Sequence, residues 1–140
     1  MNRKMAIDYG SSRMGIAISD PLGITARGIE TINWDGEKDE YLINRIIELA
    51  NEYKVDLIIV GLPRRTDGKE SESENNAKKL AEKIKEKISI EVILRDERFT
   101  TVIAHKIMRE TGVKQSKKKG ITDQIAAEIL LQDYLNHCKK

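Results

Sequence analysis

Acidic residues stand beside apolar segments at three separate places in the 140-residue chain. Asp8 ends one apolar run, Asp96 and Glu97 end another, and Asp123 shares one face of a helix-like segment with apolar side chains. A carboxylate that is removed from water is costly unless it is paired, hydrogen-bonded or bound to a cation. If the fold brings these acids to one edge of a sheet, a shared divalent cation is the simplest explanation, because Mg²⁺ and Mn²⁺ favour oxygen ligands.

Each acid also has a structural alternative. Asp8 lies two residues before Gly10 and could be only a turn residue. Asp123 could act only through the dipole of the helix, because the sequence predicts that it lies in the first helical turn. The acids at 96 and 97 could form ion pairs with the neighbouring Arg95 or Arg98. The chemical interpretation therefore depends on the coincidence of all three positions.

Several other site classes are excluded by composition and spacing. The two histidines and the single Cys138 are too few for a closed zinc site or a disulfide framework. The chain has no G-x-S-x-G elbow, no G-x-x-x-x-G-K-[ST] loop and no G-x-G-x-x-G turn. The phosphate-binding candidates are the turn at 8–13 and Arg65, with its neighbour Arg64, in the loop that follows Gly61.

The elements that must position these residues can be read from the apolar periodicity. Short β-like segments at 5–7, 14–19 and 24–34 predict an antiparallel meander. Helical stripes and buried-strand runs then alternate, which gives the order βββαβαβαα. The later elements are helices over 38–53, 77–88, 100–109 and 121–135, and strands over 55–62 and 90–94. This order predicts an α/β fold with a mixed five-stranded sheet and helices on both faces. The residues at 63–74 are expected to form a loop.

Length and charge place further limits. A chain of 140 residues corresponds to one domain, 1–140. The 25 basic and 23 acidic side chains nearly balance, so the net charge does not by itself indicate that the protein binds nucleic acid. No apolar run approaches the roughly 20 residues of a membrane span, and the N-terminus lacks a signal-peptide core. We expect a cytoplasmic protein without a membrane partner.

Four segments together resemble a known family. They are 5–20 (MAIDYGSSRMGIAISD), 60–68 (VGLPRRTDG), 95–101 (RDERFTT) and 123–132 (DQIAAEILLQ). In order and spacing they are similar to the YqgF family, also called RuvX, over nearly the whole chain. These bacterial proteins are described as nucleases of the 16S rRNA precursor or as Holliday junction resolvases. The resemblance implies an RNase H-like fold, with Asp8, Glu97 and Asp123 as catalytic acids and metal ligands and Asp96 as the less certain neighbour of Glu97.

The resemblance also implies a chemistry and a partner. Two Mg²⁺ or Mn²⁺ ions about 3.5–4 Å apart would support phosphodiester hydrolysis without a covalent intermediate. Structured RNA or branched DNA is the expected partner, and the chain has few aromatic residues for stacking single strands. A resolvase that cuts two strands symmetrically would need a homodimer. The cations expected to hold phosphates are Arg13, Arg65, Arg98, Lys117, Lys118 and Lys119, the three lysines being expected to precede the last helix.

Two other functions fit parts of the sequence. The segment Asp8–Tyr9–Gly10–Ser11–Ser12 resembles the first phosphate loop of actin-like ATPases and sugar kinases, but those proteins need two such domains around the nucleotide. A non-catalytic nucleic-acid-binding module would fit the same fold. Such a module would tolerate the loss of Asp123, whereas a nuclease would not.

Overall fold

The structure is a computed structural model that describes residues 3–10, 13–34, 39–62, 72–96 and 115–137; at 62, 72–73, 96 and 115–123 it describes the backbone alone. The elements in these residues are β1 (Arg3–Asp8), β2 (Arg13–Ser19), β3 (Ala26–Asn33), α1 (Glu40–Glu52), β4 (Val55–Leu62), α2 (Glu72–Lys87), β5 (Glu91–Asp96) and α4 (Gln115–His137). The helix predicted over 100–109 lies outside the described residues.

The strands form one sheet in the order β3-β2-β1-β4-β5. β1 pairs antiparallel with β2, and β2 pairs antiparallel with β3, which is the predicted meander. β4 pairs parallel with β1 on one side and with β5 on the other. The expected mixed five-stranded sheet is therefore confirmed, and β1, which carries Asp8, lies at its centre.

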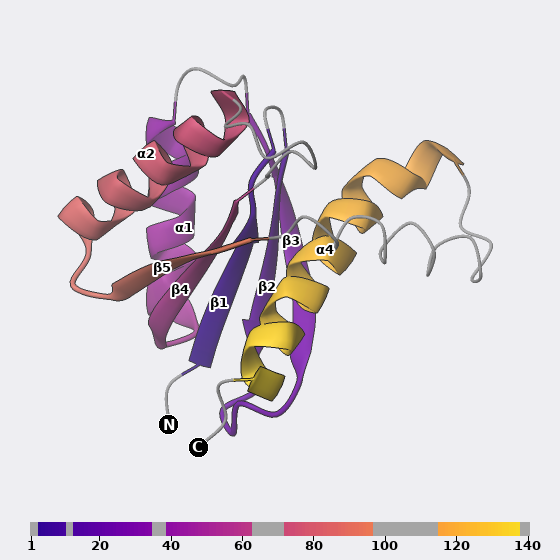
Figure 1. Cartoon of the computed structure of the whole chain (residues 1–140), viewed down its shortest axis with the longest axis horizontal. Coiled ribbons are helices and arrows are strands. Elements are labelled where there is room, and N and C mark those ends of the chain that lie inside the picture. The colour runs from indigo at the N-terminus through magenta and orange to yellow at the C-terminus, as the bar shows by residue number, and fades with distance from the viewer. Residues whose placement is uncertain (1–2, 11–12, 35–38, 63–71, 97–114, 138–140) are drawn as a thin grey trace.

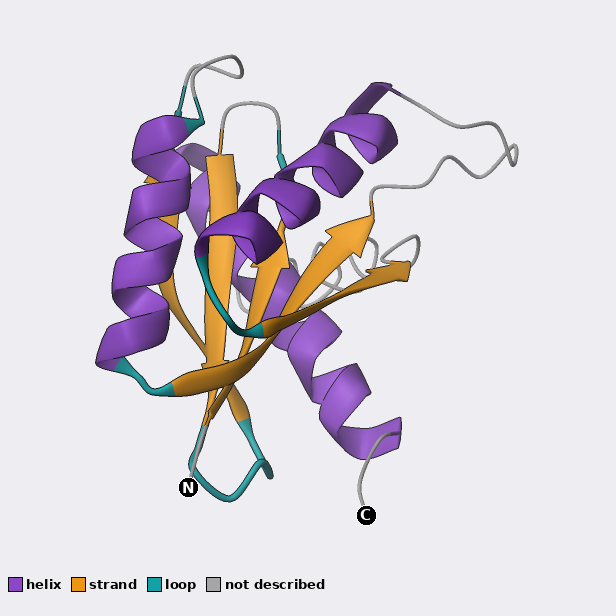
Figure 2. Cartoon of the chain, turned by 90° about the vertical axis from the view of Figure 1, so that its left-hand side faces the viewer, coloured by secondary structure: helices purple, strands orange, loops and turns teal. Residues whose placement is uncertain are grey.

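Helices cover both faces of this sheet (Figures 1 and 2). On one face, α1 and α2 enclose the larger apolar core, to which β1 contributes Met5 and Ile7. On the other face, α4 encloses a smaller core, to which β1 contributes Ala6. Successive side chains of a strand point to opposite faces, so Asp8 is in phase with Ala6 and belongs to the α4 face.

α4 also covers the outer edge of β3 with the polar side chains of Glu128 and Gln132. These two residues are one helical turn apart, so each reaches a different position along β3. Glu128 accepts a hydrogen bond from the backbone N–H of Gly28 at 2.6 Å, and Gln132 accepts one from the N–H of Ala26 at 3.0 Å. The edge of β3 therefore has its own partners in the fold, which blocks pairing with another strand there.

Two helix starts differ from the sequence-based expectation. α2 begins at Glu72, inside the segment expected to be a loop, and its polar first turn includes an i,i+4 ion pair between Glu74 and Lys78. α4 begins at Gln115 rather than at 121 and runs through Gly120. A single glycine costs a helix only about 1 kcal/mol, and lysines are good helix formers. The lysines at 117–119 thus lie within the helix and do not precede it.

An ion pair between β3 and α1 gives a prediction about acid stability. Arg45 donates from Nε and Nη2 to the two carboxylate oxygens of Glu30, at 2.8 and 2.6 Å. These hydrogen bonds, together with the positive charge, hold the pKa of Glu30 below its ordinary value. A lowered pKa stabilises the fold above the unfolded-state pKa, and this contribution is lost as the pH falls through the folded-state pKa.

We therefore expect Glu30→Gln to reduce the free energy of unfolding by about 0.5–1 kcal/mol at neutral pH. The difference from the wild type should disappear in acid, because Glu30 is then protonated in both states. Urea unfolding at a series of pH values measures this. Glu82→Gln is the matched control, because Glu82 has only an exposed 3.7 Å contact with Lys85. A Glu30→Gln deficit that persisted in acid would contradict the assignment.

Among the described helices, none is long and apolar enough to cross a membrane.

Candidate active site

A single row of residues crosses the sheet at the level of Asp8. Asp8 is the register partner of Gly15 on β2 and of Gly61 on β4. Gly15 in turn pairs with Thr31 on β3, and Gly61 pairs with Arg95 on β5. Residues in register on neighbouring strands share a face, so all five belong to the α4 face. Asp8 is the central member of this row.

Asp8 is not a turn residue. It is the last residue of β1, and only 8% of its surface is exposed. Both of its lateral neighbours in the row are glycines, so no side chain flanks the carboxylate within the sheet. A glycine inside a strand weakens it and often marks a place where a ligand or another backbone approaches closely. Two such glycines on either side of a buried acid leave room for a ligand at this point.

Asp123 is brought to the same level by α4. The next residue, Gln124, donates a hydrogen bond from Nε2 to the Thr31 hydroxyl at 3.0 Å, and Thr31 is the β3 member of the row. The backbone of α4 at 123 therefore lies level with the row that contains Asp8. The expectation that 123 is in the first helical turn is wrong, because α4 begins at Gln115. This position is more than two turns inside the helix, too far for the helix dipole to explain an acid.

The apolar residues that share a helical face with position 123 are directed inward, as expected. Ala127, Leu130 and Leu131 belong to the core between α4 and the sheet, and Tyr134 packs against it. Ala126 is also buried.

The third acidic position follows β5. Asp96 is the last residue of that strand and pairs with Leu62, one step beyond the row. Glu97 lies outside the described residues. The end of β5 and the end of β1 lie at the same edge of the sheet, because both strands run parallel to the intervening β4.

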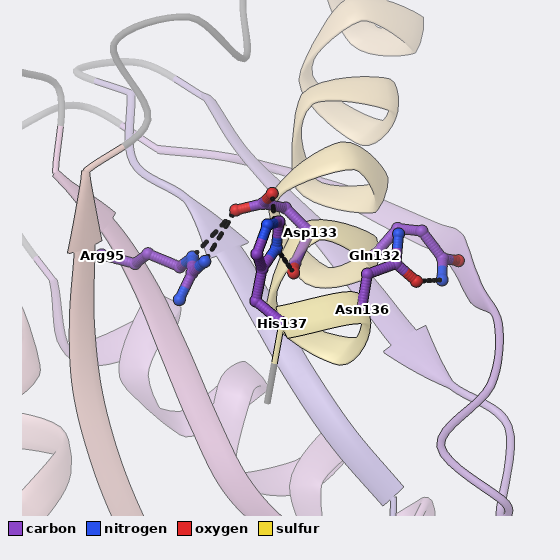
Figure 3. Close-up of polar contacts among 5 residues, drawn as sticks. All are labelled: Arg95, Gln132, Asp133, Asn136 and His137. Carbon is purple, nitrogen blue, oxygen red and sulfur yellow. Dashed lines mark hydrogen bonds and ion pairs between the residues drawn. The ribbon is translucent and has the colours of Figure 1, made fainter. Parts of the chain in front are cut away.

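Arg95 has a partner on α4. Its guanidinium donates from Nε and Nη2 to the carboxylate of Asp133 on α4, at 3.2 and 2.7 Å, and lies 5.7 Å from the centre of the Tyr134 ring. Figure 3 shows this contact, with the His137 ring below Asp133 and also directed towards it. His137 Nδ1 lies 2.8 Å from the Asp133 carbonyl oxygen and 3.1 Å from its carboxylate. These residues hold β5 to the C-terminal half of α4, which favours a structural role for them.

The structure describes some of the predicted phosphate-binding residues and not others. Arg13 is the first residue of β2, is half-buried and has interactions of its own. It pairs with Asn33 two residues from the row, at the same edge of the sheet as Asp8. Arg65 and Arg98 lie outside the described residues. Lys117, Lys118 and Lys119 lie in the first turns of α4, N-terminal to the level of Asp8.

The chemistry of the three acids suits a hard cation. Carboxylate oxygens are the ligands that Mg²⁺ and Mn²⁺ prefer, and the glycines beside Asp8 leave space around it. Within the described side chains, no three His, Cys, Asp or Glu residues gather closely enough to hold a metal ion. The side chains of Glu97 and Asp123 are not among those described, so the three-acid site stays a prediction.

Sequence reasoning missed the two glycines as site residues. Gly15 and Gly61 each stand inside an apolar strand, which is the usual signal of a close approach. Which acid they flank depends on strand register, and the sequence alone does not supply it.

The strand order, the helices on both faces and the acid on the central strand define an RNase H-like fold. The same fold is found in Thermus thermophilus RuvC in complex with Holliday junction substrate, with a TM-score of 0.59 and 13% identity over 99% of this chain and 97% of that chain. It is also found in the fowlpox virus resolvase in complex with Holliday junction DNA, with a TM-score of 0.56 and 16% identity over 99% of both chains.

The sequence comparisons identify the family. The family model "RuvX: Holliday junction resolvase" matches residues 2–137. A relative from Acetivibrio thermocellus, named "Putative pre-16S rRNA nuclease", is 48% identical over 135 residues, which cover 96% of this chain and 95% of the relative. The chain therefore belongs to the RuvX family of Holliday junction resolvases.

Proposed function

We propose that the protein is a cytoplasmic, Mg²⁺- or Mn²⁺-dependent nuclease that processes the 5′ end of pre-16S rRNA during ribosome biogenesis. One observation carries the nuclease proposal: the buried Asp8 stands between two glycines, level with position 123 of α4. The RNA substrate is favoured by the name of the Acetivibrio thermocellus relative, which is 48% identical. The cytoplasmic location is favoured by the single cysteine, because a chain without an internal disulfide suits a reducing compartment.

Asp8, Glu97 and Asp123 are the residues that would hold two ions. The alternation of β5 supports Glu97 over Asp96: Arg95 belongs to the α4 face, and 97 is in phase with 95 in the sequence, whereas 96 is not. When bound, the ions would supply Lewis-acid stabilisation of the charge that develops on the phosphate and on the leaving oxygen. The role of Asp8 itself is to present fixed carboxylate oxygens from a rigid central strand.

The cations near this edge are proposed to bind phosphates. Arg13, Arg65 and Arg98, with the lysines at 117–119, would attract the backbone of the nucleic acid and set its register. Phosphate contacts add affinity that falls with salt, but they read no sequence directly. Selectivity would then depend on the shape of the folded or branched substrate.

The second candidate is resolution of Holliday junctions. It is favoured by the family description and by the fold shared with two junction-bound resolvases. This function would need a homodimer that presents two active sites to opposite strands. A non-catalytic nucleic-acid-binding module is the candidate of another class.

One assay separates these candidates. The purified protein is incubated with a 16S precursor that carries its 5′ extension and, separately, with a four-way DNA junction, with Mg²⁺, with Mn²⁺ and with EDTA. We expect metal-dependent cleavage of the RNA and none in EDTA. Cleavage of the junction alone, by a dimer in sedimentation analysis, would support the second candidate. Binding of either substrate without cleavage in any metal would support the non-catalytic module.

A further inference from the structure

A cavity lies on the opposite face of the sheet from Asp8, under α2. It has a volume of about 130 Å³ and is lined by Tyr9, Trp34, Asp39, Asn76, Lys79, Leu80 and Lys83. Four of these residues follow the spacing i, i+3, i+4, i+7 on α2, so they form one face of that helix. The cavity is small compared with the 300–1,000 Å³ of sites that bury a whole drug-sized ligand. It suits one base or one phosphate of a longer chain.

The aromatic wall of the cavity is tied to the active-site edge. Tyr9 directly follows Asp8, and its ring meets the Trp34 ring edge-on, with centroids 6.0 Å apart and planes at 77°. Trp34 donates a hydrogen bond from Nε1 to the carbonyl oxygen of Gly10 at 2.8 Å. Both rings are thereby fixed beside the end of β1. The cavity and Asp8 therefore lie near the same end of β1, on opposite faces of the sheet.

The polar wall of the cavity presents groups that are available to a ligand. Lys83 is engaged, because its Nζ lies 2.5 Å from Oδ2 of Asp39. Within the described part of the chain, the side chains of Asn76 and Lys79 have no hydrogen-bond or ion-pair partner. Lys79 therefore adds one uncompensated positive charge, and Asn76 adds an amide that can both donate and accept hydrogen bonds.

We propose that this cavity is a subsite for one nucleotide of a single-stranded segment of nucleic acid. The base packs against Trp34 and hydrogen-bonds to the Asn76 amide, and the adjacent phosphate pairs with Lys79. An aromatic ring beside a cation is the common arrangement for single strands, because every base has a stacking face and every nucleotide has a phosphate. The inference shares with the proposed function only the premise that the ligand is a nucleic acid.

Trp34 allows a direct test, because it is the single tryptophan of the chain. The intrinsic fluorescence is titrated with hexauridylate in EDTA and, in a second arm, with inorganic phosphate. We expect a saturable change with hexauridylate and a far weaker response to phosphate. A phosphate response at the same midpoint would reduce the cavity to a simple anion site and overturn the nucleotide assignment.

Lys79→Ala is expected to raise the hexauridylate midpoint several-fold. Loss of one phosphate contact should also lower the slope of log affinity against log salt by about 0.7. Lys87→Ala is the matched control, because Lys87 is an exposed lysine of the same helix outside the cavity. Asn76→Ala should weaken binding without changing the salt slope. Equal midpoints for the Lys79 and Lys87 variants, or no saturable change at all, would overturn the proposal.

Cleavage measurements keep the two proposals separate. If the protein is a nuclease, Lys79→Ala should raise the KM for a substrate with a single-stranded flank and leave kcat unchanged, because Lys79 lies across the sheet from the acids. If no substrate is cleaved while the fluorescence results hold, the proposed function fails and the subsite stands. If cleavage is observed but the Lys79 and Lys87 variants bind alike, only the subsite fails.

Discussion

Asp8→Asn is expected to reduce metal-dependent cleavage at least about 100-fold while leaving the fold intact. Mutation of a residue that merely orients a metal ligand typically costs 10–100-fold, so loss of a ligand itself should cost no less. Asparagine has nearly the same shape, so the central strand and its packing are retained. The initial rate of cleavage at saturating Mg²⁺ measures the effect.

Thermal unfolding of the same variant should show whether Asp8 binds the metal ion. Because asparagine keeps the shape of the Asp8 side chain and removes its charge, the two proteins are compared by the change in Tm that Mg²⁺ causes in each. Adding Mg²⁺ should raise the Tm of the wild type, since a ligand that binds only the folded state stabilises it by about 2.7 kcal/mol at 100 times its Kd. The variant should lose this Mg²⁺-dependent increase.

Asp56→Asn is the control for this experiment. Asp56 is an acid near the start of β4, at the opposite edge of the sheet, where its carboxylate pairs with Lys4 at 2.7 Å. Its loss should change neither cleavage nor the Mg²⁺-dependent Tm. If Asp8→Asn cleaved like Asp56→Asn, the assignment of Asp8 as a metal ligand would be abandoned.

The sequence predicted the strands well because each is a local apolar pattern. Residues 55–62 form a continuous apolar run, which is typical of a strand buried on both faces, and β4 occupies that range as an internal strand between β1 and β5. The face assigned to 123 was also predictable, since helical periodicity aligns it with Ala127 and Leu130, which do belong to the α4 core.

The helix starts could not be predicted because their stability is not local. The first turn of α2 has no apolar residue, so its pattern is that of a loop, yet Glu74 is buried there. Gly120 has the sequence signature of a helix boundary, but α4 continues through it. In both cases the first turn has no apolar residue, so the apolar periodicity begins later than the helix does, and packing of the later turns supports the whole helix.

The register between the strands could not be predicted from the sequence either. That Gly15 and Gly61 flank Asp8, and that Gln124 reaches the same level from α4, depends on pairings between segments far apart in the chain. A register shift of one residue in β2 or β4 would place the glycine of that strand on the other face of the sheet. The sequence therefore identified the candidate acids, but it did not show that two glycines leave space around Asp8.

Gly28→Ala is expected to destabilise the fold and to reduce cleavage through α4. A Cβ at this position would lie 2.9 Å from Gln124 Cβ and 3.3 Å from its carbonyl oxygen. Neither atom is the end of a flexible chain, so α4 itself must move away from β3. Overpacking of this kind typically costs about 1–3 kcal/mol. Urea unfolding should show this loss, with a Tm lower by about 4 °C for each kcal/mol.

The displacement should reach the active site, because Gln124 is both the residue that Gly28 contacts and the neighbour of Asp123. Cleavage measured well below the Tm, where the variant is still folded, should therefore fall more than the folded fraction does. Arg27→Ala, at an exposed position on the same strand, should change neither quantity. A Gly28→Ala protein that was destabilised but cleaved at the wild-type rate would show that the contact between α4 and β3 does not position Asp123. In that case the level of Asp123 relative to Asp8 would have to be set by the packing of α4 on β1 and β2.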